Sequence, residues 1–161
     1  RRTFRRNSNL DLSFGEADPG KEENHLFEVH KVRFSSNVPE DLEEFLGPNP
    51  NGQPCRCLQL SVRLAGRLIA ASFLALGQNA CSSIYAVFDP DFSRRRLGVF
   101  TMLAELEFAR KHGFQYYYSG YATVESSCYD YKKAFSALYY FDWEASWLPV
   151  EELSLQEGST G

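Results

Sequence analysis

Tyr85-Ala-Val-Phe-Asp-Pro-Asp91 opens the stretch that decides the fold, and Tyr131-Lys-Lys-Ala-Phe135 closes it. Between them the chain places, in one unbroken order, an acidic turn, an amphipathic helix and an aromatic strand. These intervening pieces read Leu97-Gly98-Val-Phe, Glu105-Leu-Glu-Phe-Ala-Arg110 and Tyr116-Tyr-Tyr-Ser-Gly-Tyr121.

The clearest predicted element is the helix in the middle of this stretch. Its apolar residues recur at helical spacing, and basic residues before Gly113 suit the negative end of the helix dipole. The apolar positions are Val99, Met102, Leu103, Leu106 and Ala109.

Most of the remaining elements are predicted to be strands. Cys57–Leu64 and Arg67–Leu76 flank Ala65-Gly66 as a hairpin would, and Ser82–Asp89 supplies a third strand beside them. Leu26–Phe34 is assigned to a strand from its period of two, although Leu26, Val29 and Val32 would also share a helix face. The other predictions are helices over 38–46 and 129–135 and strands over 114–121 and 138–143.

This order of elements is that of the Gcn5-related N-acetyltransferase (GNAT) fold. We therefore predict an α+β, GNAT-like protein with a central, mostly antiparallel sheet flanked by helices. A polar, basic arm is predicted over residues 1–24, the domain over 25–148 and an acidic, flexible tail over 149–161.

Composition bounds the class of protein. With 161 residues, 43% of them hydrophobic and 15% aromatic, the chain has enough apolar side chains for one folded core. No apolar run approaches the ~18 residues of a membrane span, and no secretory leader is present. We expect a soluble, cytoplasmic protein that does not contact a membrane; the sequence does not indicate its oligomeric state.

The four cysteines, Cys55, Cys57, Cys81 and Cys128, lack the spacing of a zinc site, and the three histidines do not supply it. We predict free thiols and no metal, with a disulfide as the alternative.

Charge is unevenly distributed along the chain, whose net charge is −4. Affinity for nucleic acid comes mainly from Lys and Arg that neutralise phosphates, so only local basic patches could hold a tRNA. The predicted nucleic-acid contacts are Arg5, Arg6, Arg94 and Arg95, from two arginine clusters that would otherwise be solvated surface.

The ordered motifs from Tyr85 to Phe135 resemble the C-terminal catalytic domain of arginyl-tRNA and leucyl-tRNA protein transferases. Arg1-Arg-Thr-Phe-Arg-Arg-Asn7 is similar to the Arg-rich passage that joins the two domains of that family. The resemblance implies a GNAT-like enzyme that transfers Arg or Leu from tRNA to a protein N-terminus that begins with an acidic residue. Its partners would be aminoacyl-tRNA, as a co-substrate, and a protein N-terminus, with no cofactor.

Such a reaction needs little covalent help from the protein. The ester of an aminoacyl-tRNA is already activated, so the enzyme has to position the amine, accept a proton and stabilise the oxyanion. In this fold the reacting atoms lie where two strands separate, so Asp89, Asp91, Ser119 and Tyr121 are predicted to face them. As catalytic residues, the two aspartates would hold the ammonium of the aminoacyl group, or an arginine side chain by a bidentate pair, unless Asp-Pro-Asp only closes a turn.

Further residues are assigned partly by resemblance. Lys132, with Tyr131, matches the family's Tyr-Lys pair and would attract the acidic first residue of a target protein. Glu125 stands where the family often has an acid and would accept the proton, while Tyr85 would contact substrate. The alternative for Lys132 and Glu125 is an exposed surface charge. The rings of Tyr116, Tyr117 and Tyr118 are predicted to alternate between the two sides of a strand. These rings either pack in the protein core or stack on the terminal adenine of a tRNA, and the same alternatives hold for Tyr139, Tyr140 and Trp143.

Two other functions stay open. The first is a binding module without catalysis, because this chain has smaller or uncharged residues where the family carries bulky aromatic and basic ones. The second is an acetyltransferase using acetyl-CoA, whose phosphate loop is half matched by Arg95-Arg-Leu-Gly98-Val-Phe100; we expect Phe100 to obstruct the phosphate. The departures behind the first alternative are Ala122, Val124, Cys128, Tyr129 and Ala134.

Overall fold

The computed structural model describes residues 2–34, 38–52, 54–122, 127 and 129–152. The chain divides into two compact units, here called unit 1 (Arg1–Gly120) and unit 2 (Tyr121–Gly161), and each is described by itself. Across the described ranges, no helix combines the length and the apolar character that crossing a membrane would require.

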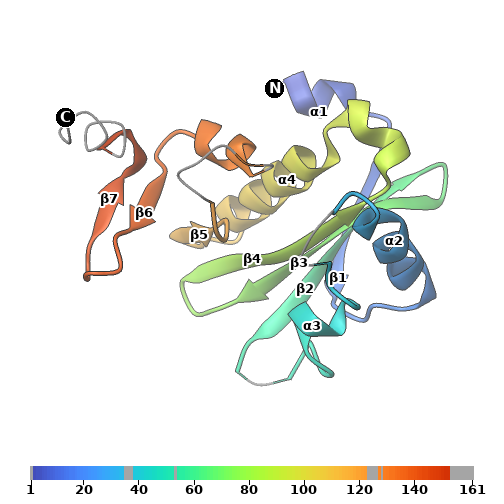
Figure 1. The fold of residues 1–161 in the computed structure, drawn as a ribbon, viewed down its shortest axis with the longest axis horizontal. Helices are drawn as coiled ribbons and strands as arrows, with labels where there is room; N and C mark the ends of the chain where they lie inside the picture. The colour runs from blue at the N-terminus through green and yellow to red at the C-terminus, as the bar shows by residue number, and fades with distance from the viewer. Residues whose placement is uncertain (1, 35–37, 53, 123–126, 128, 153–161) are drawn as a thin grey trace. The chain divides into compact units, whose positions relative to one another are not determined.

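Unit 1 is built on a five-stranded sheet in the order β1-β2-β3-β4-β5 (Figure 1). All neighbouring strands are antiparallel except β4 and β5, which are parallel. This confirms the predicted α+β, GNAT-like architecture. The strands are β1 (Asp11–Glu16), β2 (Arg56–Leu64), β3 (Arg67–Leu76), β4 (Ala80–Phe88) and β5 (Tyr116–Tyr118); the helices are α1 (Arg2–Arg6), α2 (Lys21–Lys31), α3 (Glu43–Leu46), the 3-10 helix η1 (Pro90–Arg95) and α4 (Leu97–Lys111).

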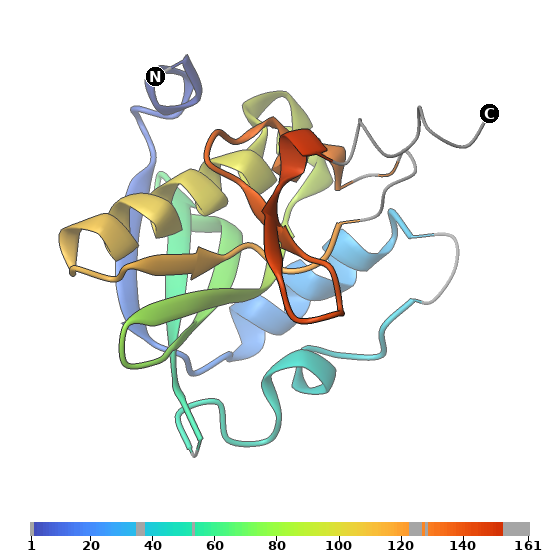
Figure 2. The ribbon, with the colours of Figure 1, turned by 90° about the vertical axis from the view of Figure 1, so that its left-hand side faces the viewer.

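The core of unit 1 lies on both faces of the sheet, with α2 on one face and α4 on the other (Figures 1 and 2). Ala71 and Phe73 of β3 belong to the cluster that holds Leu26 and Phe27 of α2. Ile69 of β3 joins the cluster around α4 instead. β3 is therefore buried on both sides, which explains its nearly unbroken apolar sequence.

The turn between β2 and β3 confirms the predicted hairpin. Ala65 and Gly66 both have positive φ, 49° and 84°. A two-residue turn with both residues in this region matches the twist of the flanking strands, and glycine adopts it without a steric cost.

The prediction of a strand over Leu26–Phe34 was wrong, because Lys21–Lys31 forms α2. The helix starts with a capping interaction in which the amide of Gly20 donates to Glu23 Oε2, 3.0 Å away. Leu26, Phe27 and His30 then share its buried face. These three residues are one, three and four positions apart, a spacing that places side chains on one face of a helix. The period of two assigned to this segment was therefore wrong.

The arm expected over residues 1–24 was also partly wrong, because Asp11–Glu16 pairs with β2 as an edge strand from Asp11↔Arg63 to Glu16↔Leu58. Most of its side chains are exposed. An edge strand that buries few side chains carries little apolar signal, which is why the segment resembled an arm.

Unit 2 contains two 3-10 helices and a small antiparallel sheet. The helix predicted over Tyr129–Phe135 corresponds to η2 (Asp130–Ala134). The strand predicted over Leu138–Trp143 corresponds to β6 (Tyr139–Phe141), but β6 pairs with β7 (Trp147–Pro149) in a separate two-stranded sheet. The η3 turn, Val150–Glu152, comes next, where the sequence predicted a flexible tail.

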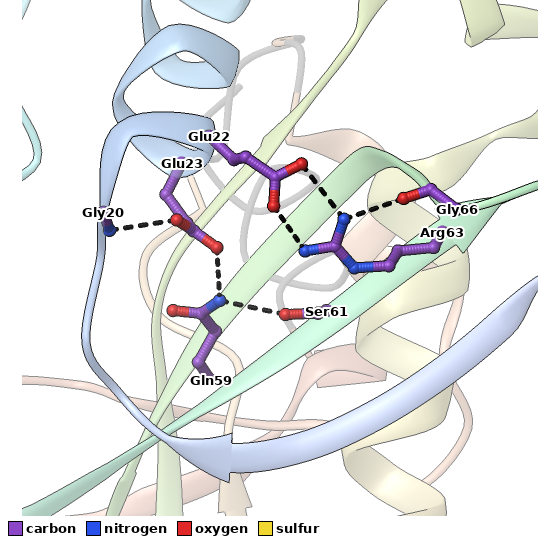
Figure 3. Close-up of polar contacts among 7 residues, drawn as sticks. All are labelled: Gly20, Glu22, Glu23, Gln59, Ser61, Arg63 and Gly66. Atoms are coloured by element: carbon purple, nitrogen blue, oxygen red, sulfur yellow. Dashed lines mark hydrogen bonds and ion pairs between the residues drawn. The ribbon is translucent and has the colours of Figure 1, made fainter.

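A polar network joins the N-terminal half of α2 to β2 (Figure 3). Glu23 Oε1 accepts a hydrogen bond from Gln59 Nε2 at 2.8 Å, and the same Nε2 donates to Ser61 Oγ at 2.9 Å. Beside them, both carboxylate oxygens of Glu22 accept from Arg63, at 3.1 and 2.6 Å. Glu23 and Gln59 are buried, so their mutual bond satisfies groups that water cannot reach.

We predict that Glu23→Ala lowers the free energy of unfolding by about 2 kcal/mol, because it removes the helix cap and one of the two acceptors of the buried Gln59 amide, which keeps only Ser61 Oγ. Urea unfolding followed by circular dichroism measures the loss. Glu28→Ala is the control: Glu28 is on the same helix but is exposed and pairs only with Lys31, so its loss should stay below about 0.5 kcal/mol. Equal effects of the two substitutions would contradict the assignment.

Candidate functional site

Strand β4 and the edge strand β5 of unit 1 separate where the sequence predicted a site. The β4–β5 pairing covers only Ala80↔Tyr116 to Ser82↔Tyr118. The β3–β4 pairing, in contrast, continues to Ala70↔Phe88. From Ser83 to Phe88, therefore, β4 has β3 along one edge and no β5 partner along the other. Strand edges carry backbone donors and acceptors that can bind another group, but at Phe88 the amide already donates to His30 Nδ1.

Asp89 ends β4 with its carboxylate almost completely buried, at 2% exposure. Its Oδ1 accepts the amide of Asp91 at 2.9 Å, and its Oδ2 accepts from Arg67 Nη2 at 2.5 Å. Both oxygens are thus used to cap η1 and to bind β3, which is the turn-closing role kept open for Asp-Pro-Asp. Asp91, by contrast, is exposed, and its carboxylate forms no ion pair with the described residues.

His30, which the sequence analysis did not single out, reaches the same point from α2. Its ring is buried at 2% exposure, and the amide of Phe88 donates to its Nδ1 at 3.1 Å. Burial lowers the pKa of His30 to about 4, so the ring is neutral at pH 7. If the segment had been predicted as a helix, His30 would have been placed on its apolar face with Leu26 and Phe27, and its burial could have been predicted from the sequence.

Tyr85, a predicted substrate contact, lies among core side chains. Its ring stacks on Phe45 of α3, with centroids 3.8 Å apart and planes 9° from parallel. It also approaches Phe27 and His30, at 6.3 and 6.2 Å. These contacts give the Tyr85 ring a packing role on the α2 side of the sheet.

β5 is fastened to α4 by one buried contact. Tyr117 Oη donates to Glu105 Oε2 at 2.5 Å, and Glu105 is 1% exposed. Burial and the Glu105 carboxylate raise the pKa of Tyr117, so the phenol stays protonated. Tyr116 and Tyr118 remain exposed, which confirms the predicted alternation of the three rings. Ser119, a predicted site residue, comes directly after β5 and is half-buried.

An arginine surface forms where α1 meets the loop before α4. We define it as the five residues Arg2, Arg5, Arg6, Arg94 and Arg96, all of which are exposed. Among the residues that the structure describes, none of the five forms an ion pair. Arg6 and Arg94 line a shallow hollow beside the start of α4, whose amide end adds to the positive field.

Arg95 holds this surface together. Its Nη1 donates to Asn9 Oδ1 at 3.0 Å, while the side chain of buried Asn7 donates from Nδ2 to the carbonyl of Arg95, also at 3.0 Å. Phe4 of α1 packs edge-on against Phe100 of α4, with ring centroids 5.7 Å apart. Of the four arginines predicted to contact nucleic acid, two are therefore engaged within the protein: Arg95 through Asn9, and Arg6, whose Nη1 donates to the carbonyl of Arg94 at 2.6 Å.

In unit 2, Lys132 contacts two of the tyrosines that precede it. Its Nζ donates to the carbonyl of Tyr121 at 3.0 Å and lies 5.1 Å from the centre of the Tyr129 ring. The Tyr121 side chain is 82% exposed. Tyr131 is half-buried, and Glu125 lies outside the described residues.

The cysteines of the described residues are free, as predicted: Cys55 is exposed, while Cys57 and Cys81 are buried. Burial raises the pKa of Cys57 and of Cys81 to about 11, so both thiols stay protonated and are poor nucleophiles. Within the same described part of the chain, no three His, Cys, Asp or Glu side chains are grouped closely enough to bind a metal ion.

One protein family matches most of this chain. The model described as "Arginine-tRNA-protein transferase, C terminus" matches residues 23–142. The match runs from α2 through β6, and so includes the separating strands β4 and β5 as well as Lys132.

The curated relatives are bacterial proteins named aspartate/glutamate leucyltransferase. The one from Leptospira interrogans is 26% identical over 138 residues, covering 83% of this chain and 54% of that protein. The one from Stenotrophomonas maltophilia is 28% identical over 131 residues, covering 81% and 48%. The one from Acinetobacter baumannii is 38% identical over 72 residues, covering 45% and 27%. The chain thus spans about half or less of the length of these relatives.

Among solved structures, a ribosomal-protein-S18-alanine N-acetyltransferase from Escherichia coli superposes with a TM-score of 0.47 at 14% sequence identity, covering 65% of this chain and 63% of that one.

We predict that the buried His30 makes the fold sensitive to acid. Its pKa is about 4 in the folded state against 6.5 in the reference state, so the unfolded chain binds the proton more tightly. The stabilisation is complete above about pH 6.5 and declines as the pH falls toward 4, by about 2 kcal/mol at pH 5. Urea unfolding at pH 7 and pH 5 measures it. His30→Asn, which keeps an acceptor near Nδ1, should reduce the difference between the two pH values; an unchanged difference would refute the role of His30.

Proposed function

Because the chain belongs to the family of arginine-tRNA-protein transferase C-terminal domains, we propose that it takes part in transferring an amino acid from an aminoacyl-tRNA to the N-terminal amine of a protein. The observation that carries this proposal is the family match over α2 to β6. The relatives' name, aspartate/glutamate leucyltransferase, favours leucine as the donated residue and Asp or Glu at the accepting end. Arginine is the alternative donor.

The chemistry suits a site without a nucleophilic side chain. The acceptor's amine attacks the ester carbonyl, a peptide bond forms, and the ester bond to the tRNA 3′ oxygen breaks. One proton leaves the amine and the tRNA oxygen gains one. The protein has to align the two substrates and stabilise the oxyanion. The edge of β4 that β5 does not cover and the exposed carboxylate of Asp91 support such a role in unit 1, and Glu125 remains the proposed proton acceptor.

Lys132 is the proposed contact for the acidic first residue of the acceptor. An ammonium attracts a carboxylate, and a charge-assisted hydrogen bond is stronger than a neutral one. The neighbouring Lys133 is a natural comparison, because its Nζ is paired with Asp130 at 2.9 Å.

The arginine surface is the proposed contact for the tRNA. Its five arginines are exposed and form no ion pair with the described residues, so their positive charge is not neutralised there and can attract phosphates; Arg6 also donates one hydrogen bond to the carbonyl of Arg94. Arg2 and Arg96 join the predicted Arg5, Arg6 and Arg94, whereas Arg95 positions the others through Asn9. The five exposed arginines are thus the proposed phosphate contacts, and Arg95 is the proposed structural residue of the surface.

No specific feature of the site favours the acetyl-CoA alternative. The sequence predicted that Phe100 would obstruct a phosphate at the start of α4. The ring is instead buried at 1% exposure and packs on Phe4, so it does not occupy that place. The absence of a cofactor therefore remains a proposal.

We predict that the chain converts peptides beginning with Asp or Glu to products extended by one residue when supplied with labelled leucyl-tRNA or arginyl-tRNA. Lys132→Ala should lower kcat/KM for these peptides roughly 10- to 100-fold, the loss of one charge-assisted bond, while the matched Lys133→Ala changes it little. Labelled peptide separated by chromatography gives the rate. No product from either tRNA, or label transferred from acetyl-CoA instead, would exclude the proposed activity.

We predict that Arg5→Ala and Arg94→Ala each weaken tRNA binding, and that each reduces the slope of log affinity against log salt concentration by about one. Filter binding across a series of salt concentrations measures both quantities. Arg110→Ala is the control, since Arg110 is equally exposed but is paired with Glu107 at 2.8 Å. If Arg110→Ala had the same effect, the arginine surface would not be the tRNA contact.

A further inference from the structure

The β6–β7 hairpin of unit 2 carries aromatic side chains on one of its faces. Phe141 and Trp147 are directly opposite each other in the antiparallel pair, and Tyr139 is opposite Pro149. Side chains alternate between the two faces of a strand, so these four residues share one face. We call this set, together with Trp143 in the turn, the aromatic face.

The rings of the aromatic face are exposed but ordered relative to one another. Trp143 is 76% exposed, Tyr139 55% and Trp147 51%. Phe141 lies between the two tryptophans, with ring centroids 5.6 Å from Trp143 and 5.4 Å from Trp147. Large apolar groups held together at a surface are typical of interaction sites.

The turn that presents Trp143 is held by a single carboxylate. Asp142 Oδ1 accepts the amides of Glu144, Ala145 and Ser146 at 2.8, 3.1 and 2.9 Å. These hydrogen bonds lower the pKa of Asp142, so the carboxylate remains ionised at neutral pH. The loop therefore carries both an aromatic ring and a fixed negative charge.

The charged residues that lie close to the aromatic face in sequence are acidic. From residue 134 to the end of the sequence there is no Lys, Arg or His, whereas Asp142, Glu144, Glu151 and Glu152 are all close in sequence to the rings. Unit 2 contains seven acidic residues and two lysines in all. A surface of this kind repels phosphates and attracts cations.

We propose that the aromatic face is a docking surface for a polypeptide segment of a partner protein that carries Lys or Arg side chains. Ammonium and guanidinium groups bind over the faces of Trp and Tyr rings, and the surrounding carboxylates add attraction over a longer range. This interaction goes beyond the transfer reaction, since neither the tRNA nor an acidic N-terminus has the charge that this surface selects.

Intrinsic fluorescence gives a direct test, because Trp143 and Trp147 are the only two tryptophans in the chain. The probe is a 12-residue peptide in which Arg and Lys alternate with Gly and Ser, titrated into the whole 161-residue chain. We predict a saturable change in tryptophan emission that weakens as salt is added. Glu144→Lys should reduce the affinity at least threefold, because it reverses a charge beside Trp143 and leaves both reporters in place.

Two controls separate docking from other causes. Glu43→Lys reverses an exposed charge on α3 in unit 1 and should leave the affinity unchanged. Trp143→Ala should reduce it about tenfold, with Trp147 as the reporter, as expected when the most exposed ring of the face is lost. If this variant changes the circular dichroism spectrum, Glu144→Lys decides the question.

Several results would overturn the proposal. They are no emission change with the basic peptide, an equal change with a peptide in which Glu replaces Arg and Lys, tighter binding of a neutral proline-rich peptide, and equal effects of Glu144→Lys and Glu43→Lys. None of these outcomes depends on transferase activity, so failure of the docking proposal is distinguishable from failure of the proposed function.

Discussion

The buried carboxylate of Asp89 is the group on which the arrangement of unit 1 depends most. It binds Arg67 at the start of β3 and caps η1 through the amide of Asp91, so it joins two strands and a helix at one point. His30 of α2 binds the backbone of Phe88 one residue earlier. Removing a partner from such a buried group leaves the other uncompensated, which costs more than the loss of a surface pair.

The segments after Asp89 in the chain depend on its position. η1 and the arginine-rich loop leave from this turn, and α4 begins directly afterwards. The loop is then tied to the N-terminal segment through Arg95, Asn7 and Asn9. The arginine surface thus forms because the turn at Asp89 places the arginine-rich loop next to the N-terminal segment, although the two are far apart in sequence. A disturbed turn at Asp89 would therefore displace both the end of β4 and the positive surface.

The two units differ in chemistry as well as in structure. Unit 1 has a layered core and an exposed cluster of arginines, whereas unit 2 is acidic and presents aromatic rings on a small hairpin. A two-stranded sheet has little hydrophobic burial of its own. The ring contacts of Phe141 and the three hydrogen bonds from backbone amides to Asp142 therefore supply much of the local order in that hairpin. The separate proposals for tRNA and for a basic polypeptide rest on this opposite charge.

The sequence by itself determined the strands β2, β3 and β4, the hairpin at Ala65-Gly66 and the helix α4, because apolar periodicity and turn residues are local signals. It missed α2 and β1, where a buried histidine and an exposed edge strand weaken those signals. The tertiary structure alone decided which charged residues are engaged: Asp89 is bound to Arg67, and Arg95 to Asn9, while Arg94 remains exposed. A carboxylate or guanidinium group looks the same in sequence whether it is solvated or paired, since its partner lies tens of residues away and only folding brings the two together.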